Sequence, residues 1–567
     1  NVEGGNTTGN SYSHTGNSIT TTVANTMLVA SHSFLSADTW TPPAGMTERV
    51  DQSAPPAPPD NAVGVALEMS EEARPAAGAT GNKTAVASGG SGTDQGIVHM
   101  LALRPAPPST PGGFNAFETS TAAGAITGVI RTKVGGVAAS IDIVALNPAR
   151  TAVFTTFTGT VRVDILNSGD NSGALDPATG CRASWTVIQT LTPDPVFLGG
   201  ELGRKTIGFT VPNVYREARV RVSFPAASPA VSGCSTDNFA IRPASFSVAA
   251  TDSNWETAGT GRALANTGAA GGNVHKAGRP FTLTVTPAPV TAISYNGDPT
   301  VSALACSLPS PCANGALTVG AFSGAGTRTS TTASYSEAGA FNLTLVDQTF
   351  AAVDAADGTP ADCSASGRYV CQSPAPASIG RFVPDRFELT ALAQPVFRTF
   401  DALDASCSVP PAGPRRSFTY VGQHFGYATA PSATVVAQNA AGATTTNYRG
   451  VLWKLTAAGV TQSAANAPVL ALDASQIGAA TLTETPDTGT GTLSASAGDK
   501  LAFVRNTAAA SAPFTANLSL TWDISDASEA GAGQGTIGTA AALVFDGGGA
   551  GIGFDSGAEI RYGRLRL

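Results

Sequence analysis

Charged side chains are scarce in this sequence of 567 residues, because Asp, Glu, Lys and Arg make up only 13% of it. That is about half of the share in an average globular protein. Lys and Arg number 32 against 40 Asp and Glu, which gives a formal net charge of −8. Binding of polyanions needs clustered Lys and Arg, and the most basic stretches are Arg415–Arg416 and the spaced Arg561, Arg564 and Arg566. We therefore expect no nucleic-acid partner.

Long apolar runs are also absent. No stretch of about 18 apolar residues occurs, so we expect the chain not to span a membrane. The sequence starts at Asn1 without a basic and apolar leader, and we expect any export signal to lie upstream. Apolar residues still make up 42% of the chain, which is enough for several cores. The length suggests three to five domains, at about 100–200 residues each.

Catalytic motifs are missing as well. None of the five histidines stands in an HExxH or another paired spacing, and no G-x-S-x-G stretch occurs. Gly533–Gly538 matches GxGxxG by letter, but the βαβ unit that a dinucleotide needs does not follow it. We therefore expect no catalysis, no cofactor and no enzyme.

Two features of the sequence are compatible with ligand binding as an alternative to a purely structural role. Asp170–Asp176 places two carboxylates and an amide within a turn, and such oxygen sets suit Ca²⁺. Asp, Asn and Gly also gather in turns for backbone reasons alone, which is the reading we favour. Tryptophans in a surface platform would indicate glycan binding, but one per domain is more often core; they are Trp40, Trp185, Trp255, Trp453 and Trp522.

The seven cysteines indicate disulfides rather than a metal site, because none forms C-x-x-C and no His stands near them at zinc spacing. Local pairs fit an oxidising, exported setting. Cys407 is left over, either as a small buried apolar residue or as half of a bond to another segment. The predicted pairs are Cys181–Cys234, Cys306–Cys312 and Cys363–Cys371.

Turn-forming residues are abundant, with 63 Gly and 37 Pro, and apolar residues alternate with polar ones between the turns. Val161–Ile165 and Phe281–Val285 are two such stretches. A period of two is typical of half-buried strands, and many short strands with frequent turns are typical of β-sandwiches. The sequence therefore predicts an all-β protein of tandem immunoglobulin-like and jelly-roll β-sandwiches.

A weak internal repeat of about 120–150 residues sets the predicted domains. Each copy opens with Pro-x-x-Phe, continues with a Gly turn (Gly135, Gly278, Gly422) and then has an aromatic-x-Gly stretch. The first two copies also share Tyr-x-Glu-Ala, at residues 215–218 and 335–338. Such self-similarity is the signature of repeated units. The predicted domains are residues 1–105, 106–243, 244–381 and 382–567.

Residues 1–105 resemble the second half of a jelly-roll module of exported bacterial and phage surface proteins, most specifically in TPPAGMTERVD at residues 41–51. The resemblance implies a partial sandwich with an open sheet edge and an uncovered apolar face. Another strand must then complete it. The alternating segment Glu559–Leu567 is one possible donor, although closure of its own sandwich is the alternative we favour.

From Phe114 onward the chain resembles the MshQ-like exported proteins, which are linked to biogenesis of the mannose-sensitive haemagglutinin type IV pilus. The most specific matching stretches are GRFVPDRF at residues 380–387 and IRYGRLRL at 560–567. The resemblance implies a non-catalytic, extracellular structural protein of a bacterial surface filament or pilus system, with self-association or pilus subunits as partners. The alternative is a surface adhesin that binds a glycan or another surface through a terminal β-sandwich.

Overall fold

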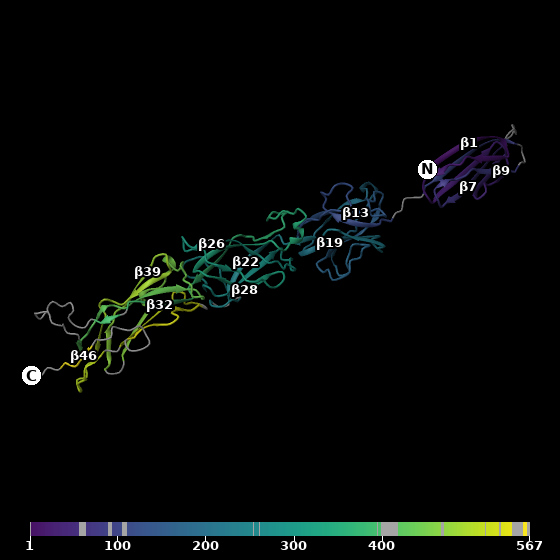
Figure 1. Cartoon of the computed structure of the whole chain (residues 1–567). Helices are drawn as coiled ribbons and strands as arrows, with labels where there is room; N and C mark the ends of the chain where they lie inside the picture. Colours follow the sequence, from purple (N-terminus) through teal and green to yellow (C-terminus); the bar gives the residue numbers. More distant parts are fainter. Residues whose placement is uncertain are drawn as a thin grey trace, which may run out of the picture. The chain divides into compact units, whose positions relative to one another are not determined.

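The structure, a computed structural model, consists of strands and short 3-10 turns, and its described residues contain no α-helix. This confirms the predicted all-β fold class. The chain divides into two compact units, residues 1–110 and 111–567 (Figure 1). The structure describes residues 2–55, 64–88, 93–104, 110–252, 255–259, 261–393, 395–397, 418–466, 470–515, 518–531, 534–546 and 559–563. Cys407 lies outside them, as do Leu565, Arg566 and Leu567 of the possible donor segment.

The N-terminal unit contains one large antiparallel sheet and two small ones. The large sheet has the order β1-β10-β4-β7-β6. Its strands are β1 (Val2–Ser11), β10 (Asp94–Leu103), β4 (Thr26–Phe34), β7 (Val65–Arg74) and β6 (Thr47–Ala54). The sheets β2-β9-β5 and β3-β8 comprise β2 (Ser13–Gly16), β9 (Lys83–Ala87), β5 (Trp40–Thr41), β3 (Thr20–Thr21) and β8 (Gly78–Ala79).

The inner face of the large sheet is covered. Alternate residues of β4 are buried, among them Leu28 and Ala30 at 0% exposure. Phe34 packs edge-on against Trp40 of the small sheet, with ring centroids 5.0 Å apart. The expectation of an uncovered inner face is therefore wrong for the described residues. Strand β1 was missed because its sequence, VEGGNTTGNS, lacks apolar alternation. Strands β1 and β6 remain as sheet edges.

Sandwich 1, the first of three in residues 111–567, consists of a sheet β11-β13-β18 and a sheet β12-β21-β19-β15-β16. The first comprises β11 (Gly113–Phe117), β13 (Ala139–Leu146) and β18 (Arg204–Phe209). The second comprises β12 (Lys133–Val134), β21 (Phe239–Arg242), β19 (Tyr215–Phe224), β15 (Arg162–Asn167) and β16 (Thr186–Thr190), with β20 (Val231–Cys234) beside β19. Smaller elements are β14 (Gly159–Thr160), β17 (Val196–Phe197) and the 3-10 turn η1 (Gly199–Glu201).

Sandwich 2 has the sheets β23-β22-β25-β28-β27 and β24-β31-β29-β26. The first comprises β23 (Arg262–Ala263), β22 (Ser245–Asp252), β25 (Phe281–Ala288), β28 (Arg328–Tyr335) and β27 (Leu317–Thr318). The second comprises β24 (His275–Lys276), β31 (Ala377–Val383), β29 (Gly339–Asp347) and β26 (Thr300–Leu308), with β30 (Val370–Cys371) beside β29 and the 3-10 turn η2 (Ala352–Ala355).

Sandwich 3 has the sheet β32-β36-β40-β39 and, facing it, the sheets β34-β46-β42 and β37-β43-β44. The first comprises β32 (Arg386–Ala393), β36 (Ser432–Gln438), β40 (Thr490–Ser494) and β39 (Thr481–Thr485). The others comprise β34 (Phe418–Tyr420), β46 (Glu559–Arg561), β42 (Phe514–Thr515), β37 (Val460–Asn466), β43 (Leu518–Asp526), β44 (Ile537–Gly538) and β45 (Leu543–Asp546). Smaller elements are β33 (Val396–Phe397), β35 (Tyr427–Thr429), β38 (Leu472–Gln476), β41 (Lys500–Phe503), η4 (Gly450–Leu452) and η5 (Ala457–Gly459).

The three sandwiches share one strand pairing. In each, a short strand pairs in parallel with the last strand of the sandwich: β12 with β21, β24 with β31, and β34 with β46. The Phe of each Pro-x-x-Phe stretch is a buried residue of the first strand, namely Phe114, Phe246 and Phe387. Strand β46 therefore closes its own sandwich, the alternative that we favoured from the sequence. The predicted boundaries at 243/244 and 381/382 stay a prediction.

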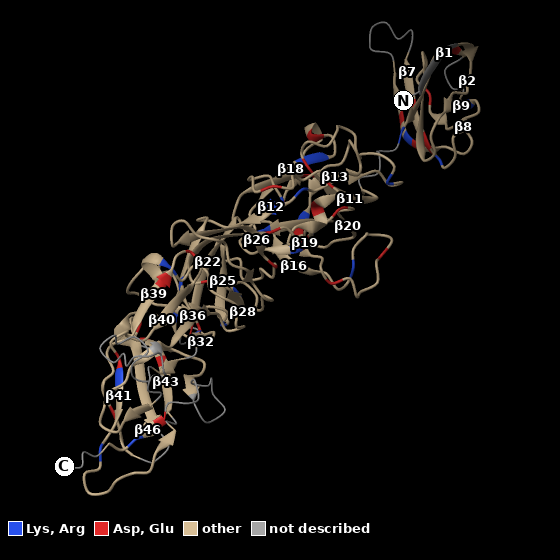
Figure 2. Ribbon diagram, turned by 60° about the vertical axis from the view of Figure 1, so that its left-hand side comes forward, with Lys and Arg blue, Asp and Glu red and all other residues tan. Residues whose placement is uncertain are grey.

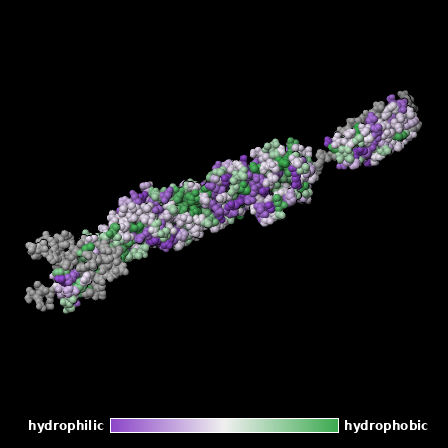
Figure 3. All heavy atoms as spheres, viewed as in Figure 1, coloured by the Kyte–Doolittle hydropathy of each residue, from purple (hydrophilic) through white to green (hydrophobic). Residues whose placement is uncertain are grey.

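Charge is thinly spread over these units (Figure 2). On the face shown in Figure 3, hydrophobic and hydrophilic residues of the unit 111–567 are intermixed. Several aliphatic side chains on loops are largely exposed, among them Leu198 and Leu202 at 61% each and Val290 at 86%. Burial of an ionic group is costly unless it has a partner, so the few ionic groups that are buried are expected to have specific partners. Many of them lie where one sandwich meets the next.

Candidate functional site

The Gly turns of sandwiches 1 and 2 lie where one sandwich contacts the next, whereas the turn of sandwich 3 lies near Arg505 of its own sandwich. Gly136, Gly278 and Gly422 have φ values of 77°, 79° and 83°, a left-handed region that favours glycine. The left-handed residue of the first turn is thus Gly136 and not its neighbour Gly135. A Cβ on Gly136 would lie 3.3 Å from Pro289 of sandwich 2, and one on Gly278 would lie 2.9 Å from the Ala440 nitrogen of sandwich 3. These two turns therefore need glycine for close approach as well as for backbone conformation.

The Tyr-x-Glu-Ala stretch of sandwich 1 binds the aromatic-x-Gly stretch of sandwich 2. Arg216 donates from Nε to Asn296 Oδ1 at 2.7 Å and from Nη2 to the Asn296 carbonyl at 2.8 Å. Beside it, Asn213 Nδ2 donates to Ser294 Oγ at 2.8 Å, and the Ser294 N–H donates back to Asn213 Oδ1 at 3.0 Å.

Between sandwiches 2 and 3, the Tyr-x-Glu-Ala stretch binds the residues just before the aromatic-x-Gly stretch. Glu337, from the second Tyr-x-Glu-Ala, accepts the N–H groups of Thr446 at 3.2 Å and Asn447 at 3.1 Å. These two residues directly precede the aromatic-x-Gly stretch Tyr448–Gly450 of sandwich 3. The motifs that repeat in the sequence therefore form the contacts between consecutive sandwiches.

Asp354, in η2 of sandwich 2, is a buried carboxyl group at the first of these junctions, with 0% exposure. It accepts the hydroxyl of Thr132 and, at 3.1 Å, the N–H of Ala240, both in sandwich 1. Burial raises its pKa to about 7, and the nearby Asp357 and Asp237 act in the same direction, whereas the two hydrogen bonds oppose the shift. Asp354 is therefore an acid that is neutral at mildly acidic pH and holds two sandwiches together.

The loop closed by Cys363–Cys371 receives a side chain of sandwich 1 at the same junction. Arg242 is 3% exposed and donates from Nε to the Gly367 carbonyl at 2.7 Å and from Nη2 to the Ser364 carbonyl at 2.9 Å. Burial lowers the pKa of this guanidinium group. Five N–H donors in one rigid plane let a single Arg bind several carbonyls of a loop.

The loop closed by Cys306–Cys312 is placed in the same way at the second junction. Next to it, Asn447 Nδ2 of sandwich 3 donates to the Ala313 carbonyl at 2.8 Å, and the Ala313 N–H donates back to Asn447 Oδ1 at 3.1 Å. Arg449 Nη2 donates to the Pro311 carbonyl at 2.8 Å. Both short disulfide loops of sandwich 2 therefore contact a neighbouring sandwich.

A buried ion pair crosses the second junction. Arg381 of β31 and Glu529 are 1% and 5% exposed, and Nη2 lies 2.6 Å from Oε2. Arg381 also donates from Nη1 to the Ala269 carbonyl at 2.5 Å and from Nη2 to the Gly271 carbonyl at 3.2 Å. Burial raises the pKa of Glu529, and Arg381 counteracts that shift. The two charges thus neutralise each other inside the junction, while Arg381 Nε is buried without a hydrogen-bond partner.

The cysteine pairs of the structure are the three that the spacing predicts, with Cα–Cα distances of 5.3, 6.0 and 5.8 Å. We expect non-reducing peptide mapping of the chain, purified without reductant, to recover Cys181–Cys234, Cys306–Cys312 and Cys363–Cys371 as linked peptides. Samples reduced before digestion serve as the control. Free thiols at these six positions would contradict the assignment.

In two of the three sandwiches, the aromatic residue of the aromatic-x-Gly stretch is a tyrosine whose hydroxyl makes a buried hydrogen bond. Tyr295 and Tyr448 are buried, and their hydroxyls donate to Asp347 Oδ2 at 2.8 Å and Asp526 Oδ2 at 3.0 Å. Burial, with the facing carboxylate, raises the pKa of both phenols. Sandwich 1 has Phe157 at this place and makes no such bond.

Removal of one of these hydroxyls should destabilise the folded chain. We expect Tyr295→Phe to lower the free energy of unfolding by about 1–3 kcal/mol, because it leaves a buried acceptor of Asp347 unpaired. Urea denaturation of the variant and the wild type measures the difference. Tyr295→Leu, which removes the ring as well as the hydroxyl, separates loss of the bond from loss of ring packing. An unchanged midpoint for Tyr295→Phe would contradict the expectation.

The carboxylates of the Asp170–Asp176 turn bind their own loop. Asp170 Oδ1 accepts the N–H of Ser172 at 2.9 Å, and Asp176 accepts the N–H of Ala178 and the hydroxyl of Thr179, both at 2.8 Å. These hydrogen bonds lower the pKa of both acids. Within the described residues no group of three His, Cys, Asp or Glu side chains is placed to hold a metal ion. The geometry is that of ordinary Asx turns.

The predicted core role of the tryptophans agrees with their burial. Trp40, Trp185, Trp255 and Trp522 are between 0% and 8% exposed, and Trp453 packs against the core of sandwich 3. Two of the five histidines form buried pairs with carboxylates, His32 with Glu68 and His275 with Asp252, each at 2.8 Å. In each pair the imidazole bonds one carboxylate oxygen, whereas Glu68 Oε1 and Asp252 Oδ1 are buried without a hydrogen-bond partner.

Sequence reasoning missed the charged residues of the junctions, Asp354, Arg242, Arg381 and Glu529. The sequence carries a weak signal for two of them, because Arg242 and Arg381 are single charges at the end of apolar or small-residue stretches in a chain that is poor in charge. Arg242, for example, follows Phe239-Ala-Ile in a fully buried strand. Isolated charges in such strands are worth examining first, because burial without a partner is costly.

Residues 337–546 match the sequence model of DUF6701, third domain. This stretch begins at Glu337 of the second junction and runs to the end of β45. The matched domain has no assigned function, and the match covers less than half of the chain. No curated protein matches the chain.

Solved structures resemble the chain at low similarity. They include the Escherichia coli adhesin FdeC, at 12% identity and a TM-score of 0.26, with 78% of this chain and 99% of that chain covered. The I9-I11 tandem of titin gives 5% identity and a TM-score of 0.17, with 75% and 97% covered. Escherichia coli alpha-2-macroglobulin gives 10% identity and a TM-score of 0.16, with 99% of this chain and 44% of that chain covered. Among the described residues, no helix is long and apolar enough to cross a membrane.

Proposed function

We propose that the chain is a non-catalytic extracellular structural protein of a bacterial surface filament or pilus system, which assembles through β-sheet contacts. The observation that carries the proposal is the position of the repeated motifs. They lie at the junctions, where Arg216 binds Asn296 and Glu337 binds Asn447. A chain whose repeated residues hold consecutive sandwiches in place is suited to spacing and bearing tension rather than to chemistry.

Two further observations support this function. The short disulfide loops are typical of proteins from oxidising compartments, and both contact a neighbouring sandwich, through Arg242 or Arg449. The resemblance of residues 114–567 to MshQ-like exported proteins supports a role in a pilus system. The DUF6701 match of residues 337–546 is compatible with that family but does not assign a role.

Immunogold electron microscopy of cells that produce the chain tests the proposal. We expect gold along surface filaments, and co-purification of the chain with filaments sheared from the cells. Cells that lack the gene serve as the control. A chain found only inside the cells, or at the surface without any filament, would contradict the proposal. Glycan binding in the latter case would favour the adhesin alternative.

A further inference from the structure

Sandwich 1 differs from its two neighbours at one sheet edge. In sandwich 2 the strand β28 pairs with β27, and in sandwich 3 the strand β40 pairs with β39. Strand β18 holds the same place in sandwich 1, but it is the last strand of its sheet. In sandwich 1 the strand β16, which precedes β18 in the chain, does not pair with β18. It joins the opposite sheet, where it pairs with β15. One strand position that the other sandwiches fill is thus empty in sandwich 1.

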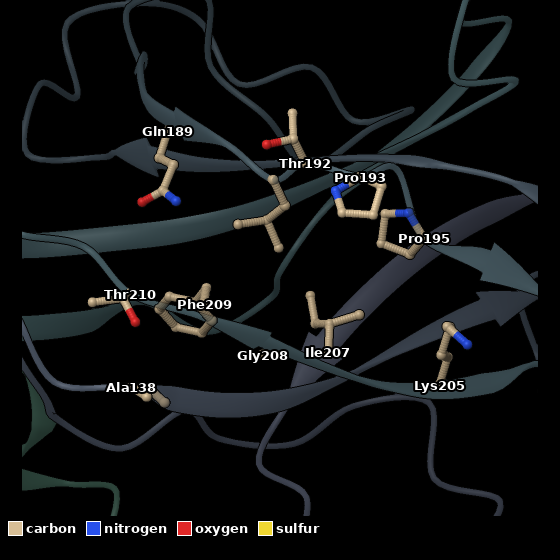
Figure 4. A pocket seen from close by; sticks show the side chains of 12 residues that line it. Ala138, Gln189, Thr192, Pro193, Pro195, Lys205, Ile207, Gly208, Phe209 and Thr210 are labelled. Carbon is tan, nitrogen blue, oxygen red and sulfur yellow. The ribbon is translucent and has the colours of Figure 1, made fainter.

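A groove of about 550 Å³ lies at this edge. Figure 4 shows Ile207, Gly208 and Phe209 of β18 on one wall, and Gln189 and Pro193 on the other. The floor is apolar, because Ile207 and Phe209 belong to the core of sandwich 1. The side-chain oxygen of Gln189 is buried and has no hydrogen-bond partner. Lys205, at one end, is already paired with Glu201.

The backbone of β18 is free on the groove side. In antiparallel pairs, residues that exchange hydrogen bonds with the partner strand alternate with residues whose N–H and C=O point away. The Ala145 N–H donates to the Gly203 carbonyl at 2.9 Å, so Lys205, Ile207 and Phe209 bond to β13 by the same alternation. Thr206 and Gly208 therefore direct their N–H and C=O groups toward the groove, ready for another strand.

The strands at the equivalent edges indicate which sequence fits. Strand β39 has the sequence TLTET, and its Leu482 packs against the core while Thr481 and Thr483 are exposed. Strand β27 places Leu317 against the core of sandwich 2 in the same way. Both pair antiparallel with their neighbour. Because Lys205 is already neutralised, the groove offers no free charge for an ionic side chain.

We propose that this groove binds an extended strand of a partner protein, in which aliphatic and threonine side chains alternate and charges are few. The strand pairs antiparallel with β18 and directs its aliphatic residues between the two sheets. Main-chain hydrogen bonds supply affinity, and alternate side chains supply register. The inference rests on the proposed function, since it names the place where a neighbouring subunit of the filament system would attach.

Peptide binding to the full, disulfide-bonded chain tests this site. The probe is a fluorescent peptide of residues 479–486, which contains the β39 sequence, and a scrambled peptide is the control. We expect Gly208→Pro to weaken binding at least about tenfold, because it removes an edge N–H and adds a ring at the edge. The matched control, Gly208→Ala, should bind within about twofold of wild type, because a Cβ there meets nothing closer than the Ala139 oxygen at 3.8 Å.

Gln189→Lys, on the opposite wall, is a second variant in case Gly208→Pro does not fold, and it should weaken binding by a similar factor. The proposal would be overturned if the peptide does not bind the wild type, or if Gly208→Pro and Gln189→Lys both bind it as tightly as the wild type does. Self-association of the chain that Gly208→Pro abolishes would overturn the choice of a partner protein in favour of a second copy. The binding assay uses the purified chain and does not depend on filaments. A negative binding result therefore says nothing about whether the chain lies on filaments, and a chain that is not on filaments could still bind the peptide.

Discussion

Replacement of Arg381 by Met should lower the free energy of unfolding by about 3–5 kcal/mol. The substitution removes a 2.6 Å ion pair and leaves Glu529, at 5% exposure, without its counter-charge. It also leaves the carbonyls of Ala269 and Gly271 without their donor. Guanidinium denaturation followed by tryptophan fluorescence measures the loss, because Trp522 and Trp255 belong to the core cluster of sandwich 3.

The double variant Arg381→Met with Glu529→Leu identifies the cause. Replacement of a buried ion pair by apolar side chains is often neutral, whereas removal of one partner leaves an uncompensated charge. We therefore expect the double variant to recover most of the stability that Arg381→Met loses. Arg381→Lys, which keeps the charge but not the planar set of donors, should fall between the two. A double variant as unstable as Arg381→Met would show that the hydrogen bonds to the carbonyls, and not the ion pair, hold the junction.

The repeat could be predicted from the sequence because it depends on local patterns. Alternating stretches such as Phe281–Val285 become strands, and the Phe of each Pro-x-x-Phe becomes a buried residue of a first strand. Strand β1 could not be predicted in this way. Its Gly, Asn and Thr residues carry no apolar period, and its position follows from pairing with β10 across more than 80 residues of chain.

The role of the motifs in the junctions could not be predicted from the sequence either. Arg381 and Glu529 are 148 residues apart in the chain, and nothing local connects them. Glu337 stands in a predicted motif, yet its partners Thr446 and Asn447 precede a different motif in the next copy. A repeat indicates which residues recur, whereas the contacts between copies depend on how successive sandwiches pack. That packing is a property of the folded chain.

The stability of the junction between sandwiches 1 and 2 should fall as the pH rises from about 4 to about 7. Asp354 has a pKa of about 7 in the folded chain, above its ordinary value of 3.8. The folded state therefore binds more protons than the unfolded state within this window, and its advantage is lost as the pH rises through the folded pKa. At about 1.4 kcal/mol per pKa unit, the loss amounts to about 4 kcal/mol.

Asp354→Asn isolates this effect, because an amide keeps an oxygen for the Ala240 N–H and offers an N–H to the Thr132 hydroxyl without titrating. We expect the variant to match wild type near pH 4 and to exceed it by several kcal/mol at pH 8. Denaturation at a series of pH values measures the difference, and the exposed Asp194→Asn is the matched control. Ionisation of Asp354 beside Asp237 and Asp357, whose pKa values burial also raises, opposes contact between the two sandwiches. A stability difference that does not change with pH would show that Asp354 is charged in the folded chain at all these values.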